Sequence, residues 1–208
     1  MGAGQSTLFR RRADGRVRGR RALRVGDVRD THAGVLGKPF WRLFASSTGR
    51  PAGHPDASLI LPSFLIGTFP TPDDAAWLHH SHGITAIISL QDDGDLASKG
   101  LDLFELERSY QEHGLRFHRV PVPDGDTETL ALRLDQIVAL LDELLGGGEC
   151  VYLHCNAGLN RAPTVAIAYL HAIRGLPLIE ARDFVKQRRH CVPYMRLLAA
   201  RYTPDMEL

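Results

Sequence analysis

Short apolar runs alternate with amphipathic segments from about residue 57 onward. Runs of this length, bounded by glycine, proline and polar residues, are typical of buried β-strands. The four runs read SLILPSFLIG, ITAIISLQ, LRFHRVPV and CVYLHC. Their alternation with helical segments predicts an α/β fold, with a central, mostly parallel sheet flanked by helices in a single domain.

The ends of three helices can be placed from capping and breaking residues. TPDDAAWLHH begins one helix, with Thr71 as its cap. A second is predicted over residues 127–145, because apolar residues recur there at helical spacing and glycines at 146–148 follow. A third begins at Arg161 and is expected to end at Gly175. The apolar face of the second helix consists of Leu130, Leu134, Ile137, Val138, Leu141, Leu144 and Leu145.

The N-terminal quarter of the chain lacks sustained apolar periodicity and is rich in arginine. Such a segment buries too little apolar surface to offset the entropy lost on ordering it. We therefore predict a basic, disordered arm over residues 1–56 and a folded domain over residues 57–204. Within the arm, FWRLFASS around Trp41 is the stretch predicted to dock on the domain.

Charge and cysteine content exclude several classes of protein. The formal net charge is +1, whereas a nucleic-acid-binding domain usually has a strong basic excess, so no nucleic-acid partner is expected. Cys150, Cys155 and Cys191 form an odd set without regular spacing, which argues against a secreted disulfide scaffold. Thiols persist best in a reducing compartment, and the cytoplasm is the predicted location.

The first residues carry competing signals. MGAGQST matches the pattern for N-myristoylation of Gly2, and the arginine run behind it could supply the second signal that one acyl chain needs for membrane attachment. An arginine-rich, acid-poor segment over residues 1–24 also fits organelle targeting. The remaining alternative is an unmodified arm whose arginines reflect a GC-rich genome. Weak membrane association through the arm is therefore one of three hypotheses.

The stretch VYLHCNAGLNRAPTVAIAYL sets a cysteine and an arginine on either side of a short loop. Backbone amides of small, neutral residues can turn inward and bind an anion, and the positive end of a following helix adds to this. Such a site would stabilise Cys155 as a thiolate, and the planar Arg161 guanidinium could hold two phosphate oxygens. The alternative is a buried structural cysteine near an unrelated surface arginine.

Thiolate attack on a phosphate ester requires a proton for the departing oxygen. The segment VPVPDGDTETL offers two acids, Asp124 and Asp126. Asp126 stands immediately before a predicted helix, where aspartate is a natural N-cap. Asp124 has no such local duty, and we predict it as the acid, with Asp126 as the alternative.

The motif HCNAGLNRAP resembles the active-site loop of the cysteine-dependent dual-specificity phosphatases, and the resemblance extends over about residues 58–195. It implies a phosphotyrosine-phosphatase-like fold and phosphomonoester hydrolysis through a phosphocysteine, without a cofactor or metal. It makes Cys155 the nucleophile, Arg161 the phosphate clamp and His154 an orienting residue. The phosphate cradle would be formed by Asn156, Ala157, Gly158, Leu159 and Asn160.

Some features also resemble the glucan phosphatases within this family: SLQDDGDL, the Asn-Ala-Gly-Leu run and Arg-Ala-Pro. Asn160, however, replaces their glycine before the arginine, and Gly125 replaces their aromatic residue between two aspartates. The neutral loop favours a singly phosphorylated group, so phosphotyrosine and phosphoserine or phosphothreonine proteins are the predicted substrates, with a phospho-carbohydrate as the alternative. Ala162 replaces the serine or threonine of many relatives, which predicts slower hydrolysis of the phosphocysteine.

Other classes of function fit the sequence less well. A phosphate-binding pseudo-enzyme would be expected to lack the nucleophile, the arginine or the acid, and a rhodanese-like sulfurtransferase has no need of the upstream acid. His79, His80 and His82 in WLHHSHG suggest metal ligands. The favoured interpretation is the last turn of a helix, where histidines complement the negative end of the dipole, because no carboxylate or cysteine partner is in view, and no metal site is predicted.

Overall fold

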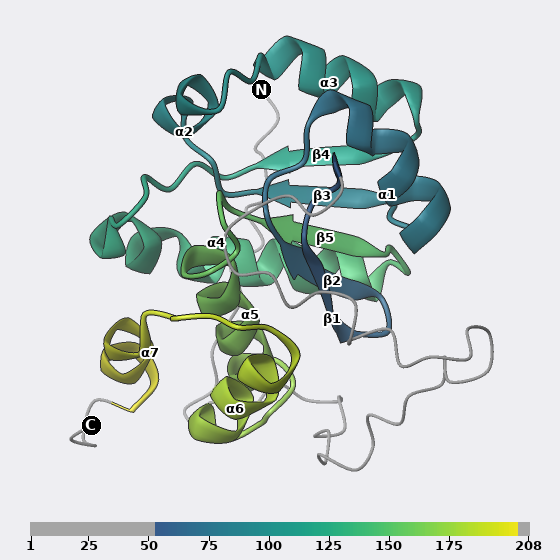
Figure 1. Cartoon of the computed structure of the whole chain (residues 1–208). Coiled ribbons are helices and arrows are strands. Elements are labelled where there is room, and N and C mark those ends of the chain that lie inside the picture. The colour runs from purple at the N-terminus through teal and green to yellow at the C-terminus, as the bar shows by residue number, and fades with distance from the viewer. Residues whose placement is uncertain (1–52, 204–208) are drawn as a thin grey trace, which may run out of the picture.

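A computed structural model describes residues 53–203 of the 208-residue chain. The predictions for Gly2, Trp41 and the rest of residues 1–52 lie outside the described residues. Within them, one five-stranded sheet carries helices on both faces (Figure 1). The predicted α/β fold is confirmed.

The sheet has the strand order β1-β2-β5-β3-β4. β1 (Ala57–Leu61) and β2 (Phe64–Gly67) form an antiparallel hairpin. β2 then pairs in parallel with β5 (Val151–His154), β5 with β3 (Ala86–Ser89), and β3 with β4 (Arg116–Arg119). The carboxyl ends of these parallel strands lie at one edge of the sheet, which is where α/β proteins usually bind ligands.

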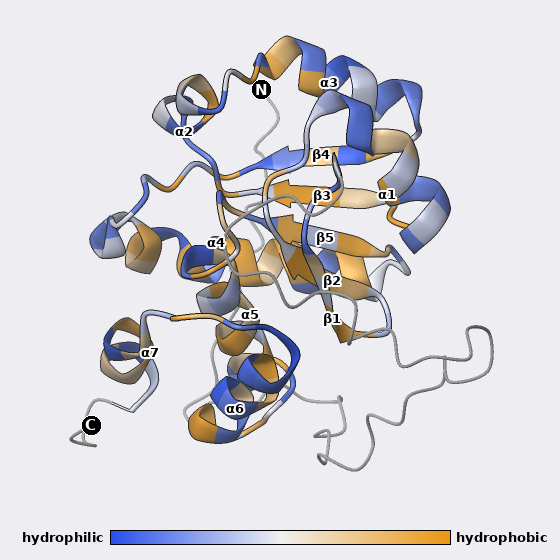
Figure 2. Cartoon of the chain, viewed as in Figure 1, coloured by the Kyte–Doolittle hydropathy of each residue, from blue (hydrophilic) through white to orange (hydrophobic). Residues whose placement is uncertain are grey.

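Successive strand residues point to opposite apolar layers. Ile88 and Leu153 pack in one cluster, whereas Ile87 and Tyr152 pack in the other. One layer holds the 3-10 helix Pro72–Asp74, α1 (Ala75–His82), α2 (Asp93–Ser98) and α3 (Leu103–Glu112). The other holds α4 (Thr127–Gly146), α5 (Arg161–Ala172), α6 (Leu178–Arg188) and α7 (Met195–Tyr202). Figure 2 shows the apolar strands β2, β3 and β5 between these layers.

α4 matches the predicted helix over residues 127–145. Its predicted apolar face is buried except for Leu145, which is partly buried against the same cluster. The N-cap is also as predicted, because the Asp126 carboxylate accepts a hydrogen bond of 2.9 Å from the Thr129 amide. Near Thr71 the helix starts with the short 3-10 turn, and α1 follows it.

α5 is the central helix of the second layer, and its residues from Arg161 to Leu170 are all buried. It lies between α4 and α6 (Figure 1). It ends at Ala172, three residues before the expected Gly175, which has a φ of 78°. One short loop joins β5 to α5, so the positive N-terminal end of the α5 dipole lies at this loop.

Residues 53–56, which the sequence assigns to the arm, lie on the domain. The His54 ring stacks on Trp77 with ring centroids 4.6 Å apart. Asp56 is buried and forms an ion pair of 3.3 Å with Arg189. Among the described helices, none is long and apolar enough to span a membrane.

Candidate active site

The loop between β5 and α5, residues 155–160, is called the cysteine loop here. Two hydrogen bonds fix its start to the neighbouring strands. The Leu90 amide donates to the His154 carbonyl oxygen at 3.0 Å, and the Phe69 amide donates to the Asn156 carbonyl oxygen at 3.0 Å. Cys155 is only 3% exposed. The nucleophile candidate therefore lies at the base of the loop, against the carboxyl ends of the strands.

Gly158 gives the cysteine loop its shape. Its φ is 62°, a left-handed conformation that favours glycine. A Cβ here would lie 2.6 Å from both the carbonyl carbon of Gly67 and Nη2 of Arg189. Only glycine allows the loop to come this close to β2.

Arg189 holds the outer side of the cysteine loop, and it was not anticipated from the sequence. Its Nε donates to the Gly158 carbonyl oxygen at 2.7 Å, and its Nη2 donates to the Ala157 carbonyl oxygen at 3.0 Å. A trans peptide unit points its N–H opposite to its C=O. The amides of Gly158 and Leu159 therefore point away from Arg189, toward the inside of the loop. No local pattern distinguishes Arg189 from the adjacent Arg188.

Asp56, directly before β1, and Ser58 in β1 anchor Arg189. The Arg189 Nη1 atom donates to the Asp56 carbonyl oxygen at 3.3 Å and to Ser58 Oγ at 3.2 Å. Burial raises the pKa of Asp56, although the charge and the hydrogen bond of Arg189 act to lower it. The guanidinium is therefore held by the hairpin on one side and holds the cysteine loop on the other.

Arg161 closes the cysteine loop and is 1% exposed. Its Nη1 donates at 2.6 Å to both Asp95 Oδ2 and the Val122 carbonyl oxygen. Burial acts to lower the pKa of Arg161, but the hydrogen bond with Asp95 and the charges of Cys155, Asp95 and Asp124 raise it overall. The guanidinium is therefore a fixed cation at the start of α5.

The other donors of Arg161 have no fixed acceptor. Its Nε and Nη2 atoms are buried, and they donate no hydrogen bond within the described part of the chain. Nη2 lies 3.2 Å from Asp124 Oδ1, which is an ion-pair contact. The Nε and Nη2 edge is the side of a guanidinium that binds two oxygens of one phosphate. The anchored Nη1 thus leaves this edge available to an anion.

The segment SLQDDGDL supports the cysteine loop from the end of β3. Asn156 Nδ2 donates to Asp95 Oδ1 at 2.5 Å, and Gln91 Nε2 donates to Asn156 Oδ1 at 2.8 Å. Asp95 therefore contacts both ends of the loop, through Asn156 and Arg161. The sequence singles out this segment only through its likeness to glucan phosphatases, and it did not predict that Gln91 and Asp95 would hydrogen-bond to the cysteine loop.

Asp124 lies on a tight turn in residues 121–126, called the acid loop here. The Asp126 amide donates to the Pro123 carbonyl oxygen at 3.1 Å, and Gly125 has a φ of 80°, as a type II turn requires at this position. The Asp124 side chain is 57% exposed and reaches Arg161. The structure brings this carboxylate to the cysteine loop.

Asp126 caps the N-terminus of α4. Its carboxylate accepts hydrogen bonds from the Thr129 hydroxyl at 2.6 Å and the Thr129 amide at 2.9 Å. These two hydrogen bonds lower the pKa of Asp126. An ionised cap at the positive end of α4 is poorly suited to donate a proton, so the geometry supports the choice of Asp124.

His154 is the last residue of β5 and is buried. Burial lowers its pKa to about 3, and the positive charge of Arg161 acts in the same direction. Its Nδ1 lies 3.3 Å from the Cys155 carbonyl oxygen. The imidazole is therefore neutral near pH 7, and the role of His154 as an orienting residue stays a prediction.

The structure shows that Thr164 does not replace the hydroxyl missing at Ala162. The Thr164 hydroxyl donates to the Asn160 carbonyl oxygen at 2.7 Å and accepts a hydrogen bond of 2.9 Å from the Tyr194 amide. Both of these contacts lie at the start of α5. Slower hydrolysis of a phosphocysteine therefore stays a prediction.

The other cysteines and the histidine cluster lie elsewhere. Cys150 and Cys191 are free thiols, and burial raises the pKa of each. His79 contacts the Ile84 carbonyl oxygen through Nδ1 at 3.0 Å, beyond the end of α1. Across residues 53–203, no group of three or more ligand-type side chains could hold a metal ion.

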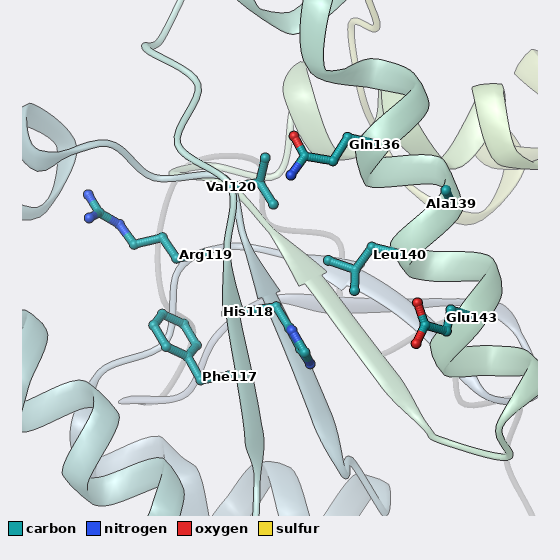
Figure 3. A pocket seen from close by; sticks show the side chains of 8 residues that line it. All are labelled: Phe117, His118, Arg119, Val120, Gln136, Ala139, Leu140 and Glu143. Atoms are coloured by element: carbon teal, nitrogen blue, oxygen red, sulfur yellow. The ribbon is translucent and has the colours of Figure 1, made fainter. Parts of the chain in front are cut away.

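A hollow lies between β4 and α4 (Figure 3). His118 on β4 faces Leu140 and Glu143 on α4. Burial and the charge of Arg116 lower the pKa of His118, against the opposing effect of Glu143. None of the candidate catalytic residues lines this hollow, so it is separate from the cysteine loop.

Comparison with known families agrees with this geometry. Residues 72–199 match the catalytic domain of dual specificity phosphatases. The chain belongs to this family. The matched region runs from the 3-10 helix to α7, so it contains the acid loop, the cysteine loop and Arg189.

Two curated proteins are about a third identical to the chain over the aligned residues. The phosphoglucan phosphatase DSP4, amyloplastic, of Castanea sativa is 33% identical over 141 residues, which cover 65% of this chain and 37% of that protein. Laforin of Mus musculus is 32% identical over 154 residues, which cover 68% of this chain and 47% of laforin. The chain spans less than half the length of these relatives.

Solved structures confirm the phosphotyrosine-phosphatase-like fold. Tk-PTP in its active form superposes with a TM-score of 0.58 at 25% identity, covering 69% of this chain and 94% of Tk-PTP. PTPMT1 superposes with a TM-score of 0.58 at 21% identity, covering 68% of this chain and 88% of PTPMT1. The second likeness is one of fold alone.

Proposed function

We propose that this protein hydrolyses phosphomonoesters through a phosphocysteine intermediate. One observation carries the proposal. The Nε and Nη2 atoms of Arg161 are buried and donate no hydrogen bond in residues 53–203, and Arg161 is close enough to Cys155 for the two charges to interact. A buried cation whose Nη2 makes an ion-pair contact with the exposed Asp124 carboxylate, beside a thiol and inward amides, suits a phosphate dianion.

In the first step, the Cys155 thiolate attacks phosphorus. The sulfur–phosphorus bond forms as the bond from phosphorus to the leaving oxygen breaks, and the Asp124 carboxylic acid gives that oxygen its proton. Arg161 and the loop amides stabilise the charge on the phosphoryl oxygens. The products of this half-reaction are an alcohol or phenol and the phosphocysteine.

In the second step, water hydrolyses the phosphocysteine. The Asp124 carboxylate takes a proton from water, and the water oxygen attacks phosphorus. The sulfur–phosphorus bond then breaks, which restores the Cys155 thiolate and releases inorganic phosphate. Asp124 is again protonated and ready for the next cycle.

We propose phosphotyrosine and phosphoserine or phosphothreonine proteins as substrates. Residues 156–160 of the cysteine loop are all neutral, and the cation that follows them is Arg161, which suits a single phosphate. Gly125 supplies no ring for stacking a sugar. The segment SLQDDGDL resembles the glucan phosphatases. Its Gln91 and Asp95 hydrogen-bond to Asn156 and Arg161, so this segment has a structural role and is weak evidence for a carbohydrate substrate.

A phospho-carbohydrate substrate is the second candidate, and the observation that favours it is the similarity to the phosphoglucan phosphatase DSP4. Rates on a phosphotyrosine peptide, a phosphothreonine peptide and phosphorylated glucan distinguish the two. Faster release of phosphate from the peptides supports the protein substrates. Co-sedimentation with insoluble starch or glycogen, together with faster release from glucan, would reverse the preference.

The nucleophile is tested by Cys155→Ser, which is expected to abolish turnover of an aryl phosphate while phosphate still binds. Cys150→Ser is the matched control, because Cys150 is a free cysteine directly before β5, the strand that Cys155 follows, and should tolerate the change. Near-normal rates for Cys155→Ser would refute the mechanism.

We propose a cytoplasmic location, because free thiols suit a reducing compartment. The relative DSP4 is named amyloplastic, which supports organelle targeting through residues 1–24 as an alternative. Weak membrane association through Gly2 is a third. Imaging the full chain, a chain lacking residues 1–24 and Gly2→Ala separates these: only a membrane signal lost in Gly2→Ala supports acylation.

A further inference from the structure

The connection between α6 and α7, residues 189–194, lies along the outer side of the cysteine loop. Figure 1 shows it crossing α5. Its first residue, Arg189, binds two carbonyl oxygens of that loop. The next carbonyl oxygen, that of Leu159, accepts a hydrogen bond of 2.8 Å from the Val192 amide. The connection therefore follows the loop toward its Arg161 end.

Asn160 holds Val192 from the other side of its peptide backbone. Asn160 Nδ2 donates to the Val192 carbonyl oxygen at 2.7 Å. Both backbone polar groups of Val192 are thus bonded to the cysteine loop, one to Leu159 and one to Asn160. A glycine in place of Asn160 would have no side chain to make the second of these bonds.

Thr164 fixes the end of the same connection. Its hydroxyl accepts a hydrogen bond of 2.9 Å from the amide of Tyr194, which comes two residues after Val192. Thr164 is fully buried in the first turn of α5. Val192 is therefore held relative to the helix that begins at Arg161.

The Val192 side chain is 62% exposed. Single exposed apolar residues are common on protein surfaces, and exposure alone assigns no function to them. The position of Val192 is what distinguishes it, because its backbone is bonded to the two residues that directly precede Arg161. An exposed apolar side chain is thus fixed at the Arg161 end of the cysteine loop.

The proposed acid approaches the same end of the loop from a different element. Asp124 Oδ1 lies 3.2 Å from Arg161 Nη2. A general acid acts only within hydrogen-bonding reach of the leaving oxygen. The group that carries this oxygen must therefore leave the loop at its Arg161 end, on the side where Val192 is held.

We propose that Val192 is a specificity-determining residue that packs against the aromatic ring of a phosphotyrosine substrate, and that Asn160 positions it. The ring of phosphotyrosine is bonded directly to the leaving oxygen, and burying ring and valine carbons together removes apolar surface from water. A sugar has hydroxyls on most of its ring carbons, and burying these against valine without a partner is unfavourable. The inference rests on the proposed function, because it requires the substrate phosphate to bind in the cysteine loop.

The test measures binding of a phosphotyrosine peptide and a phosphothreonine peptide of the same flanking sequence to Cys155→Ser, which forms no phosphocysteine. Adding Val192→Ser should raise Kd for the phosphotyrosine peptide about fivefold and leave Kd for the phosphothreonine peptide within about twofold. Ile179→Ser, an exposed position on α6, is the matched control and should change neither Kd. Equal losses on both peptides, or an unchanged Kd for phosphotyrosine, would overturn the proposal.

The role of Asn160 is tested in the same background. Asn160→Gly should cause the same selective loss, and hydrogen exchange at the Val192 amide should become about tenfold faster, while the later turns of α5 are unchanged. Asn160→Gly combined with Val192→Ser should bind no more weakly than Val192→Ser, because residues that act through one another are not additive. Additive losses, or unchanged exchange at Val192, would show that Asn160 does not position it.

Binding and turnover keep this inference separate from the proposed function. If the wild-type protein hydrolysed neither peptide but Cys155→Ser showed the expected selectivity, the proposed catalysis would fail and the contact with Val192 would stand. If the wild-type protein hydrolysed a small aryl phosphate but Cys155→Ser bound neither peptide, the proposed catalysis would stand and the contact would be refuted.

Discussion

The Nε atom of Arg189 donates a hydrogen bond of 2.7 Å to the carbonyl oxygen of Gly158, and the arginine itself is 5% exposed. This contact, with the one to Ala157, sets the direction of the loop amides. We expect Arg189→Lys to lower kcat/KM by about 10²-fold. The single ammonium group of lysine cannot bind both carbonyl oxygens as the planar guanidinium does, and small displacements of an active-site loop strongly reduce the rate. Steady-state kinetics on an aryl phosphate measures this.

The adjacent Arg188 provides the control. Its guanidinium lies 3.5 Å from the centre of the Phe184 ring, on the same helix. Arg188→Lys should therefore keep full activity. A comparable loss in both variants would mean that Arg189 acts through helix stability and not through the cysteine loop.

A second prediction concerns Asp95, which accepts hydrogen bonds from both Asn156 and Arg161. Asp95→Asn keeps the size of the side chain but removes the charge and one acceptor. The Arg161 guanidinium should lose its orientation, and we expect KM to rise about tenfold or more, with a smaller fall in kcat. Asp93→Asn, an exposed position in the same short helix, should leave both parameters unchanged; if it does not, the effect belongs to α2 as a whole.

The two aspartates of the acid loop should differ in leaving-group dependence. Asp124→Asn is expected to slow alkyl phosphates by about 10²-fold or more and activated aryl phosphates far less. Asp126→Asn should instead lower the thermal midpoint, because the cap of α4 loses its ionised carboxylate. Comparing the ratio of alkyl to aryl rates in the two variants checks this, and a reversal of the phenotypes would exchange their assignments.

His154 should make the stability of the protein depend on pH. Its pKa is about 3 in the folded protein, against about 6.5 for a free imidazole. Below pH 6.5 the unfolded chain therefore binds a proton that the folded chain does not. The free energy of unfolding should fall by about 1.4 kcal/mol per pH unit for this one group as the pH drops toward 3.

Urea unfolding between pH 7 and pH 4 measures that slope. His154→Asn should make it shallower. Tyr152→Phe, on the same strand, loses a hydrogen bond to the Thr68 carbonyl oxygen and should lower stability at every pH without changing the slope. An unchanged slope in His154→Asn would place the acid sensitivity in other histidines or in carboxylates such as Asp126, whose pKa is lowered.

Most of the sheet could be predicted because its strands are buried on both faces. Ile87 and Ile88 face opposite layers and are both fully buried, so ITAIISLQ reads as one apolar run. The run SLILPSFLIG was less clear, since it forms two strands. Pro62 has no amide to donate, and the chain turns there between β1 and β2.

The candidate site could be predicted only where its residues are close in sequence. Cys155 and Arg161 bound one short loop, and Asp124 lies on a recognisable turn. Asp95 and Arg189 contact the cysteine loop across 61 and 31 residues of chain, respectively. Such contacts depend on how strands and helices pack, and no local pattern in the sequence reveals them.

Gly125 and Gly158 differ in how freely each could change during evolution. A side chain at Gly125 would meet open space. The energetic cost of a substitution there comes only from the backbone φ of 80°, a conformation that asparagine adopts more easily than most residues. At Gly158 any side chain also collides with Gly67 and Arg189. New specificity can therefore arise by single changes in the acid loop, whereas the cysteine loop can vary at Gly158 only if β2 and Arg189 change with it.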